Sequence, residues 1–270
     1  MSAENNQPDW DAIAEKFDLW LPHIAPVGAS LIQALRAQAG DHIIDLASGT
    51  GEPALTLARQ FNGAVTIVGV DAAEGMVRAA HNKVIQEKLS GIEFKKMPAE
   101  TLTFGDNTFD KALCRFGVML FEDPLKGLQE MRRVLKPGGR FALAVWSTPE
   151  TMPTLCWSYK VFKDKVPEEQ HPPIAKVTSM GGPDVLDDHL YRAGFTNFQV
   201  TKHIFNYDFK SFGDYWDTVE ASDILKQQYD ALDTKERESI RDEVGRFAKD
   251  FINNGRLIIP HEYLMATGTK

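Results

Sequence analysis

Cysteine is scarce in this chain of 270 residues, which has only two, Cys114 and Cys156. Neither belongs to a Cys-x-x-Cys pair or to a Cys/His spacing typical of zinc sites. The sequence therefore predicts no disulfide framework and no metal site. It favours a reduced, cytoplasmic compartment, where isolated cysteines are the norm.

Tracts of positive charge and long apolar runs are also missing. The 30 basic residues are outnumbered by 38 acidic ones, giving a net charge of −8. Without a cluster of Lys and Arg to neutralise phosphates, a nucleic-acid partner is not expected. No apolar run is long enough to cross a bilayer, and residues 1–7 are polar where a signal region would be apolar. We expect no membrane insertion, and a monomer or a homodimer.

What the chain does have is an apolar run that enters a tight glycine turn. Residues 42–55 read His-Ile-Ile-Asp-Leu-Ala-Ser-Gly-Thr-Gly-Glu-Pro-Ala-Leu. This order predicts a strand, a glycine loop and a helix, the opening unit of a nucleotide-binding α/β sheet. Because Gly49-x-Gly51-x-x-Ala54 formally fits the dinucleotide fingerprint, an NAD-dependent oxidoreductase is one alternative.

The charges around this loop favour a different cofactor. Asp45 ends the predicted strand, Glu52 lies on the first helical turn, and Pro53 has no N–H to offer a phosphate. Two carboxylates beside a pyrophosphate would repel it. They suit a ligand with positive charge and no phosphate, as in S-adenosylmethionine, which carries an ammonium and a sulfonium.

The glycine loop and two later segments occur in the order that a family pattern requires. Asp45 to Gly51 reads Asp-Leu-Ala-Ser-Gly-Thr-Gly, Val65 to Asp71 is an apolar strand ending in an acid, and Glu130 to Trp146 combines a helix, a Pro-Gly-Gly turn and a strand. Over residues 40–147 the chain resembles class I S-adenosylmethionine-dependent methyltransferases, most closely the branch of ubiquinone and menaquinone C-methyltransferases. Ala47 replaces the first glycine of the acidic-x-Gly-x-Gly-x-Gly motif, a departure that costs little if its φ is negative.

The resemblance implies how the cofactor is held. Asp45 and the backbone of Gly49 and Gly51 would bind the methionine end, and Asp71 would bind the ribose hydroxyls. The adenine would lie between Ala99, Glu100 and Met76. The complete set of expected cofactor-binding residues is Asp45, Ala47, Gly49, Gly51, Asp71, Ala72, Met76, Ala99, Glu100 and Arg115.

The implied fold is a Rossmann-like α/β sheet of seven strands, six parallel and the last antiparallel, with helices on both faces. Pro22 and Pro26 predict a break between two N-terminal helices. Two insertions are expected to form, with the N-terminal helices, a lid over the acceptor. The expected parts are 1–39 (N-terminal helices), 40–147 (cofactor-binding core), 148–182 (insertion), 183–210 (core helix and strand six), 211–256 (helical insertion) and 257–270 (last strand).

The acceptor is expected to be a small molecule among aromatic side chains, since ligand pockets are largely apolar. The expected acceptor-binding residues are Phe17, Trp20, Phe116, Trp146, Tyr207 and Trp216. His261 and His171 are candidates for a general base, needed only if the acceptor must lose a proton.

The predicted reaction is methyl transfer from S-adenosyl-L-methionine, leaving S-adenosyl-L-homocysteine, to an oxygen, nitrogen or carbon atom of an aromatic, quinone-like or polyketide-like molecule. Positioning and the exclusion of water would supply most of the acceleration. A methyltransferase-like protein that catalyses a rearrangement instead remains open, because fold does not settle function.

Overall fold

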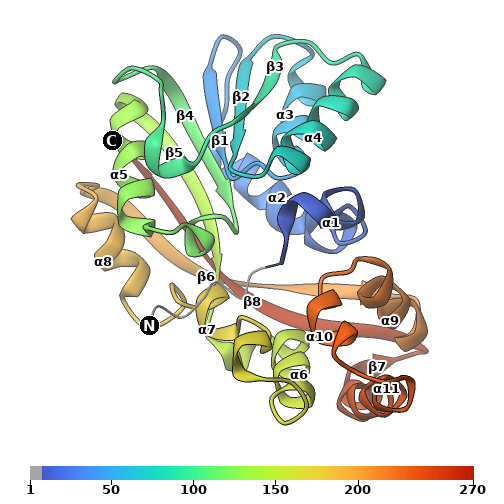
Figure 1. The fold of residues 1–270 in the computed structure, drawn as a ribbon. Helices are drawn as coiled ribbons and strands as arrows, with labels where there is room; N and C mark the ends of the chain where they lie inside the picture. The colour runs from blue at the N-terminus through green and yellow to red at the C-terminus, as the bar shows by residue number, and fades with distance from the viewer. Residues whose placement is uncertain (1–7) are drawn as a thin grey trace.

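The computed structural model describes residues 8–270 (Figure 1). Its sheet has the strand order β3-β2-β1-β4-β5-β8-β6, and β7 pairs only with β8. All neighbours from β3 to β5 are parallel, whereas β8 runs antiparallel between β5 and β6. The predicted mostly parallel α/β sheet is confirmed, with the short β7 as an eighth strand. The strands are β1 (His42–Leu46), β2 (Thr66–Asp71), β3 (Ile92–Lys96), β4 (Phe109–Arg115), β5 (Leu135–Trp146), β6 (Asn197–Phe209), β7 (Ile252–Asn253) and β8 (Arg256–Thr269).

Helices cover both faces of the sheet (Figure 1). The path from β1 through β2 to β3 advances in one direction and the path from β4 to β5 in the other, so right-handed crossovers place α3 and α4 opposite α5. α2 packs against β4, β5 and β6, and α8 packs against α5. The helices are α1 (Trp10–Phe17), α2 (Leu21–Leu35), α3 (Ala54–Phe61), α4 (Glu74–Glu87), α5 (Pro124–Val134), α6 (Pro153–Phe162), α7 (Ile174–Val177), α8 (Val185–Arg192), α9 (Phe212–Ala221), α10 (Lys226–Asp230) and α11 (Thr234–Ala248).

Helix α2 contains the two prolines that the sequence predicts as a break between helices. Pro22 lies in its first turn, where a missing N–H costs nothing, but Pro26 lies inside the helix. An internal proline costs about 3 kcal/mol. Val27, Leu31 and Leu35 are fully buried, and each such side chain contributes about 1.5–3 kcal/mol. Burial therefore outweighs the proline, and the predicted boundary is wrong.

The strands β6 and β8 are the longest of the sheet, with 13 and 14 residues. Helices from the two predicted insertions gather around their far part (Figure 1). α6 packs against β8 and α11, and α9 packs against β6 and β8. One continuous apolar core runs from α2 through the sheet into α9 and α11, so these helices extend the core of the sheet.

Among residues 8–270, no helix combines the length and the apolar character that crossing a bilayer requires. No group of three or more His, Cys, Asp or Glu side chains within the same range could hold a metal ion.

Candidate cofactor and acceptor site

The glycine loop after β1 needs its glycines for two different reasons. Gly49 has φ 53° and its N–H donates to Asp71 Oδ2 at 2.8 Å, which ties the ends of β1 and β2 together. Gly51 has φ 107°, and a Cβ there would lie 2.6 Å from Leu55 Cδ1. The backbone can therefore turn sharply over the sheet and lie close to helix α3.

Ala47 does not have the negative φ that would make its replacement of the motif's first glycine inexpensive. Its φ is 52°, in the left-handed region, where a residue with a Cβ is less stable by about 1–2 kcal/mol. The first glycine of the family motif is thus replaced at a position that favours glycine. Gly117 faces it so closely that a Cβ on Gly117 would lie 2.5 Å from the Cβ of Ala47.

The start of helix α3 has few donors left for a phosphate. Glu52 Oε2 accepts from the N–H of Thr56 at 3.1 Å and from its hydroxyl at 2.7 Å, while Arg59 donates to Glu52 Oε1 at 2.6 Å. Pro53 has no N–H, and Gly49 already donates to Asp71. A pyrophosphate needs such donors free at a helix start, so the geometry disfavours the dinucleotide alternative.

Asp45 is the most unusual polar group at this edge of the sheet. Its side chain is fully buried, and neither carboxylate oxygen has a hydrogen-bond partner among the described residues. Burial raises the pKa of this carboxyl to about 7, and the charge of Arg115 and the nearby backbone N–H of Ala54, at the start of α3, pull it partly back down. A buried carboxylate without a partner is costly, so a cationic group such as the cofactor's ammonium fits here.

Asp71, at the end of β2, is positioned by backbone groups. Its two oxygens accept from Gly49 and from the N–H of Ala73 at 3.0 Å. Burial and the nearby carboxylate of Asp11 raise the pKa of Asp71. A carboxylate oxygen can accept more than one hydrogen bond, so both oxygens retain capacity for ribose hydroxyls.

The residues expected around the adenine differ in their surroundings. Ala99 is buried, and Glu100 accepts from the N–H of Glu122 at 2.9 Å. Ala72 is exposed at the start of the loop after β2. Met76 is buried in a small cluster with Ile13 and Ala14 of α1.

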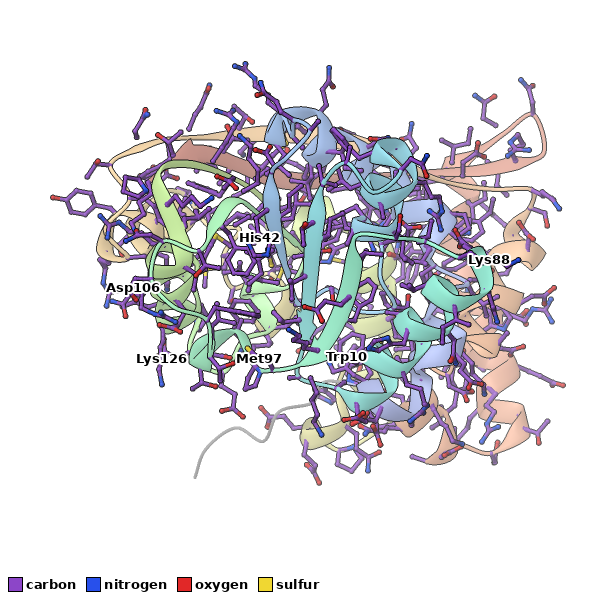
Figure 2. All side chains as sticks on the ribbon, turned by 90° about the horizontal axis from the view of Figure 1, so that it is seen from above. Trp10, His42, Lys88, Met97, Asp106 and Lys126 are labelled. Atoms are coloured by element: carbon purple, nitrogen blue, oxygen red, sulfur yellow. The ribbon has the colours of Figure 1, made fainter. Side chains whose placement is uncertain are left out.

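Helix α1 lies across the loops that follow β1 and β2. Asp18, just after the helix, pairs with Lys83 of α4 at 2.6 Å and accepts from the hydroxyl of Thr50 at 2.5 Å. Asp11 accepts from the N–H of Gly75. Figure 2 shows Trp10 of α1 at the margin of the sheet near Met97, away from His42 at the start of β1. The N-terminal helix therefore closes over the carboxyl ends of the strands.

Strand register brings residues far apart in the chain to one face. Asp45 pairs with Leu113, two residues before Arg115, and Arg115 pairs with Ala144, two residues before Trp146. Pairing through β8 continues this face to Phe205 and Tyr207, because alternate residues of a strand share a face. Arg115 also lies under α2, 3.6 Å from the point where a Cβ on Gly28 would be.

Aromatic rings line this face beyond Arg115. Phe116 stacks on Trp146 with centroids 3.7 Å apart, and Trp146 lies nearly parallel to Phe205 at 5.8 Å. Tyr207 stacks on His261 at 4.1 Å, and Trp20 of α2 lies 5.9 Å from Tyr207. We call Phe116, Trp146, Phe205, Tyr207 and His261 the aromatic wall.

His261 has both ring nitrogens engaged. Nδ1 lies 3.1 Å from the carbonyl of Ile259, so Nδ1 carries a proton and donates it. Nε2 then accepts from the hydroxyl of Thr154 at 2.8 Å. Burial lowers the pKa of His261 to about 4, so the ring is neutral at pH 7. The other candidate base, His171, lies in the segment after α6, with Nε2 3.2 Å from the carbonyl of Val166.

The remaining predicted acceptor residues lie in different environments. Phe17 is partly buried at the end of α1, edge-on to Trp10. Trp216 is buried within α9 and donates to Glu220 of the same helix at 2.8 Å. Phe205 belongs to the wall but is absent from the predicted set. Its alternation with Tyr207 along β6 is the sequence signal that could have found it.

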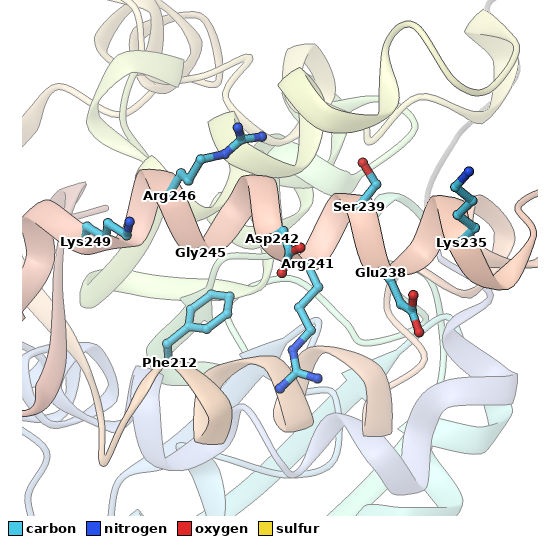
Figure 3. A pocket seen from close by; sticks show the side chains of 9 residues that line it. All are labelled: Phe212, Lys235, Glu238, Ser239, Arg241, Asp242, Gly245, Arg246 and Lys249. Atoms are coloured by element: carbon cyan, nitrogen blue, oxygen red, sulfur yellow. The ribbon is translucent and has the colours of Figure 1, made fainter.

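A surface groove lies away from this site. It is an open groove between α9 and α11, shown in Figure 3 and bordered by Phe212 and charged side chains of α11 such as Arg241 and Asp242. Its lining is mostly charged and includes no residue of the glycine loop or the wall. The site is therefore defined by strand ends and register rather than by this groove.

Known proteins share both the sequence pattern and the fold. The ubiquinone/menaquinone biosynthesis C-methyltransferase UbiE of Geobacter sulfurreducens is 42% identical over 121 residues, covering 44% of this chain and 47% of that protein. The demethylmenaquinone methyltransferase of Bacteroides fragilis is 34% identical over 158 residues, covering 56% and 64%. The matched part thus spans less than two thirds of these relatives.

Solved structures support the fold class. The YcgJ protein from Bacillus subtilis superposes with a TM-score of 0.63 at 19% identity, over 91% of this chain and 98% of that one. A Haemonchus contortus phosphoethanolamine N-methyltransferase 2, in complex with S-adenosyl-L-methionine, gives 0.61 at 16% identity, over 96% and 57%.

The profile of the "ubiE/COQ5 methyltransferase family" matches residues 6–172, more than half of the chain. The family that the sequence predicts is thereby confirmed. The chain belongs to the ubiE/COQ5 methyltransferase family.

Proposed function

We propose that this protein transfers the methyl group of S-adenosyl-L-methionine to a small, flat, electron-rich aromatic molecule of the quinol class. The observation that carries the proposal is the buried carboxylate of Asp45, which has no partner and lies beside a loop with few donors free for phosphate. A cationic cofactor without phosphate satisfies both conditions.

Different residues of the chain would bind different parts of the cofactor. Asp45 would accept from the ammonium, and Asp71, held by two backbone N–H groups, would accept from the ribose hydroxyls. Ala99 and Glu100 would lie along the adenine. When bound, the sulfonium supplies a methyl group that needs only an aligned nucleophile.

The acceptor would lie against the aromatic wall. Stacked rings such as Phe116 and Trp146 offer a flat apolar surface, on which a planar ring packs favourably. The names of the curated relatives refer to ubiquinone and menaquinone biosynthesis and to methylation at carbon. We therefore favour a ring carbon of a hydroquinone-like molecule as the attacking atom.

The wall offers no base at neutral pH. His261 uses both nitrogens within the protein, and burial holds its pKa near 4. Burial raises the pKa of Tyr207 above its usual value, so Tyr207 stays protonated. The acceptor must then arrive nucleophilic, as an ionised quinol does. After its ring carbon has taken the methyl group, the displaced ring proton moves to the quinol oxygen by tautomerisation, which restores the aromatic ring without a protein base. The wall would orient it and exclude water.

Incubation with methyl-labelled S-adenosylmethionine and a panel of naphtho- and benzohydroquinones tests this function. We expect labelled acceptor and equal amounts of S-adenosylhomocysteine, and no product from the oxidised quinones. Tight cofactor binding with no labelled acceptor, but with a cofactor-dependent product of unchanged mass, would point instead to a rearrangement.

A further inference from the structure

Two hydrogen-bond donors beside the aromatic wall have no acceptor among the described residues. Trp20 is 9% exposed, and its Nε1 is buried without a hydrogen-bond partner in residues 8–270. Tyr207 is 7% exposed, and no hydrogen bond joins its hydroxyl to another residue of that range. An indole N–H can only donate, and a buried donor without an acceptor is unfavourable. Both groups therefore favour a ligand that brings an oxygen.

The two donors belong to neighbouring rings on different elements. Trp20 lies just before α2, where its N–H donates to the carbonyl of Phe17 at 2.9 Å and its carbonyl accepts from Ile24 at 3.2 Å. The indole ring lies 5.9 Å from the ring of Tyr207 and edge-on to Phe209 of β6 at 6.4 Å. The backbone thus fixes Trp20 at the junction of α1 and α2, and packing on β6 holds its ring beside Tyr207.

The surroundings of the Tyr207 hydroxyl favour an oxygen with negative charge. Burial raises the pKa of Tyr207, so the hydroxyl keeps its proton and can donate it. Arg115 acts on this hydroxyl as a positive charge, and no carboxylate among the described residues acts on it as a negative one. The titratable rings nearby are neutral at pH 7, because burial raises the pKa of Tyr215 and lowers those of His23 and His261.

We propose that Trp20 Nε1 and the Tyr207 hydroxyl together bind one ring oxygen of the acceptor in its ionised form, and so decide which ring carbon faces the cofactor. The class of acceptor rests on the proposed function. Both donors are neutral, and their hydrogen bonds to an ionised oxygen are stronger than those to a hydroxyl. The pair would therefore raise the ionised fraction of a bound quinol. The carbon next to an ionised oxygen is nucleophilic, so fixing the oxygen fixes the site of methylation.

Binding of 4-nitrophenol, whose ionised form is yellow, tests the pair without turnover. In the presence of S-adenosylhomocysteine, absorbance titrations across pH should show the phenolate bound at least about 10-fold more tightly than the neutral phenol. The bound probe should then ionise at a lower pH than the free probe. Tyr207→Phe and Trp20→Phe each remove one donor and keep an aromatic ring. Each should reduce the preference for the phenolate about 3- to 10-fold, with the Kd for S-adenosylhomocysteine unchanged.

The position of methylation gives a second measurement. With a hydroquinone whose free ring carbons are not equivalent, the wild type should form a single methylated isomer, identified by NMR. Tyr207→Phe should form a mixture of isomers with a higher KM for the acceptor, because the ring oxygen is no longer held in one place.

Tyr229 provides a matched control for Tyr207. Its hydroxyl is also buried without a partner in residues 8–270, but it lies on α10, with its ring edge-on to Phe162 of α6 at 5.6 Å. Tyr229→Phe should leave the preference for the phenolate and the single isomer unchanged. Trp157→Phe, at a buried tryptophan of α6, is the corresponding control for Trp20→Phe. Thermal unfolding of each variant, followed by circular dichroism, establishes that it is folded before its binding is interpreted.

The outcomes separate the donor pair from the function. The pair is overturned if the wild type does not bind the probe or shows no preference for the phenolate, if neither variant changes that preference, or if the control variants change it equally. Methylation of hydroquinones by the same wild-type protein would leave the proposed function standing in each of these cases. If instead the preference is present and both variants reduce it, but no hydroquinone is methylated, the proposed function fails and the pair stands as a binding site for phenolates.

Discussion

Asp45 and His261 are buried polar side chains on the same face of one sheet, yet the protein treats them in opposite ways. Asp45, on β1, has two oxygens without partners. His261, on β8, has both nitrogens engaged by Thr154 and Ile259. Asp45 can therefore accept hydrogen bonds from a ligand, as proposed above, whereas His261 is held by groups of the protein itself.

The contrast extends to their neighbours. Around Asp45, on what we call the cofactor side, Arg115 also lacks a hydrogen-bonded partner. Around His261, on the acceptor side, aromatic faces such as Trp146 and Phe205 dominate, and Ser147 is paired with Glu262 at 2.6 Å. The cofactor side would select by charge and the acceptor side by shape.

The largest expected effect comes from removing the negative charge of Asp45. Asp45→Asn replaces an acceptor of the ammonium by a neutral amide, and a hydrogen bond to a charged group is worth about 1.5–3 kcal/mol. Calorimetry should show S-adenosylhomocysteine bound about 10- to 100-fold more weakly. Glu93→Gln, at an exposed carboxylate on β3, is the control. Equal affinity in both variants would contradict the role of Asp45.

The free energy of unfolding should depend on pH through the ionisation of Asp45. Burial raises the pKa of Asp45 to about 7 in the folded protein, against an ordinary value of 3.8. Between these values the unfolded chain has lost the proton that the folded protein keeps, so stability should fall as pH rises from 4 to 7.

Asp45→Asn removes this dependence. At pH 8 it should stabilise the ligand-free protein by about 1–3 kcal/mol, since one unit of pKa corresponds to about 1.4 kcal/mol. In the wild type, affinity for S-adenosylhomocysteine should fall as pH drops below 7, where Asp45 becomes protonated beside Arg115 and Asp71. Urea unfolding of both proteins at pH 5 and pH 8 measures the stability difference, and identical pH profiles would contradict it.

A pair of tryptophan variants tests the acceptor side. Trp146→Phe reduces the stacking surface between Phe116 and Phe205, and such contacts are worth about 0.5–1.5 kcal/mol. The KM for the acceptor should rise about 2- to 10-fold with the Kd for S-adenosylhomocysteine unchanged. Trp157→Phe, within the buried core of α6, should lower the Tm without changing KM. A change in cofactor affinity for Trp146→Phe would break the division between the two sides.

The contacts that hold α1 over the ends of the strands should contribute less to cofactor binding. Lys83 pairs with Asp18 and donates to the carbonyl of Thr50 at 2.9 Å, and partly exposed pairs of this kind contribute about 0.2–1 kcal/mol. Lys83→Met should speed release of S-adenosylhomocysteine about two- to fivefold in stopped-flow displacement, with less difference at high salt. Lys96→Met, at an exposed pair with Glu74, should not change the rate.

The cofactor side could largely be predicted from the sequence because its signals are local. Asp45 and Asp71 lie near the carboxyl ends of two apolar strands, and the glycine loop comes directly after the first. Both strands are predicted from the sequence and are present in the sheet. The sequence does not show which of the carboxylates around the loop is hydrogen-bonded within the protein. Glu52 accepts from Thr56 and Arg59, whereas Asp45 has no hydrogen-bond partner among the described residues. Residue type alone does not distinguish them.

The acceptor side depends on contacts between distant residues. Thr154 and His261 are separated by 107 positions, so the sequence suggested a free base at His261 without showing that its nitrogen would be engaged. Met76 is expected beside the adenine, and the sequence does not show that it also packs against α1. Pro26 predicted a helix end, and burial of the α2 face against the sheet overrode it.

The smallest expected effect lies in the loop that joins the two sides. Ala47 has φ 52°, which costs about 1–2 kcal/mol for a residue with a Cβ. Ala47→Gly relieves this strain but adds about 0.5–1 kcal/mol of unfolded-state entropy, so a net gain of about 0.5 kcal/mol is expected. Calorimetry should show a Tm higher by roughly 1–2 °C. Gly117→Ala, whose new Cβ would lie 2.5 Å from that of Ala47, should lower the Tm, and combining it with Ala47→Gly should restore part of the loss because the clashing methyl is gone.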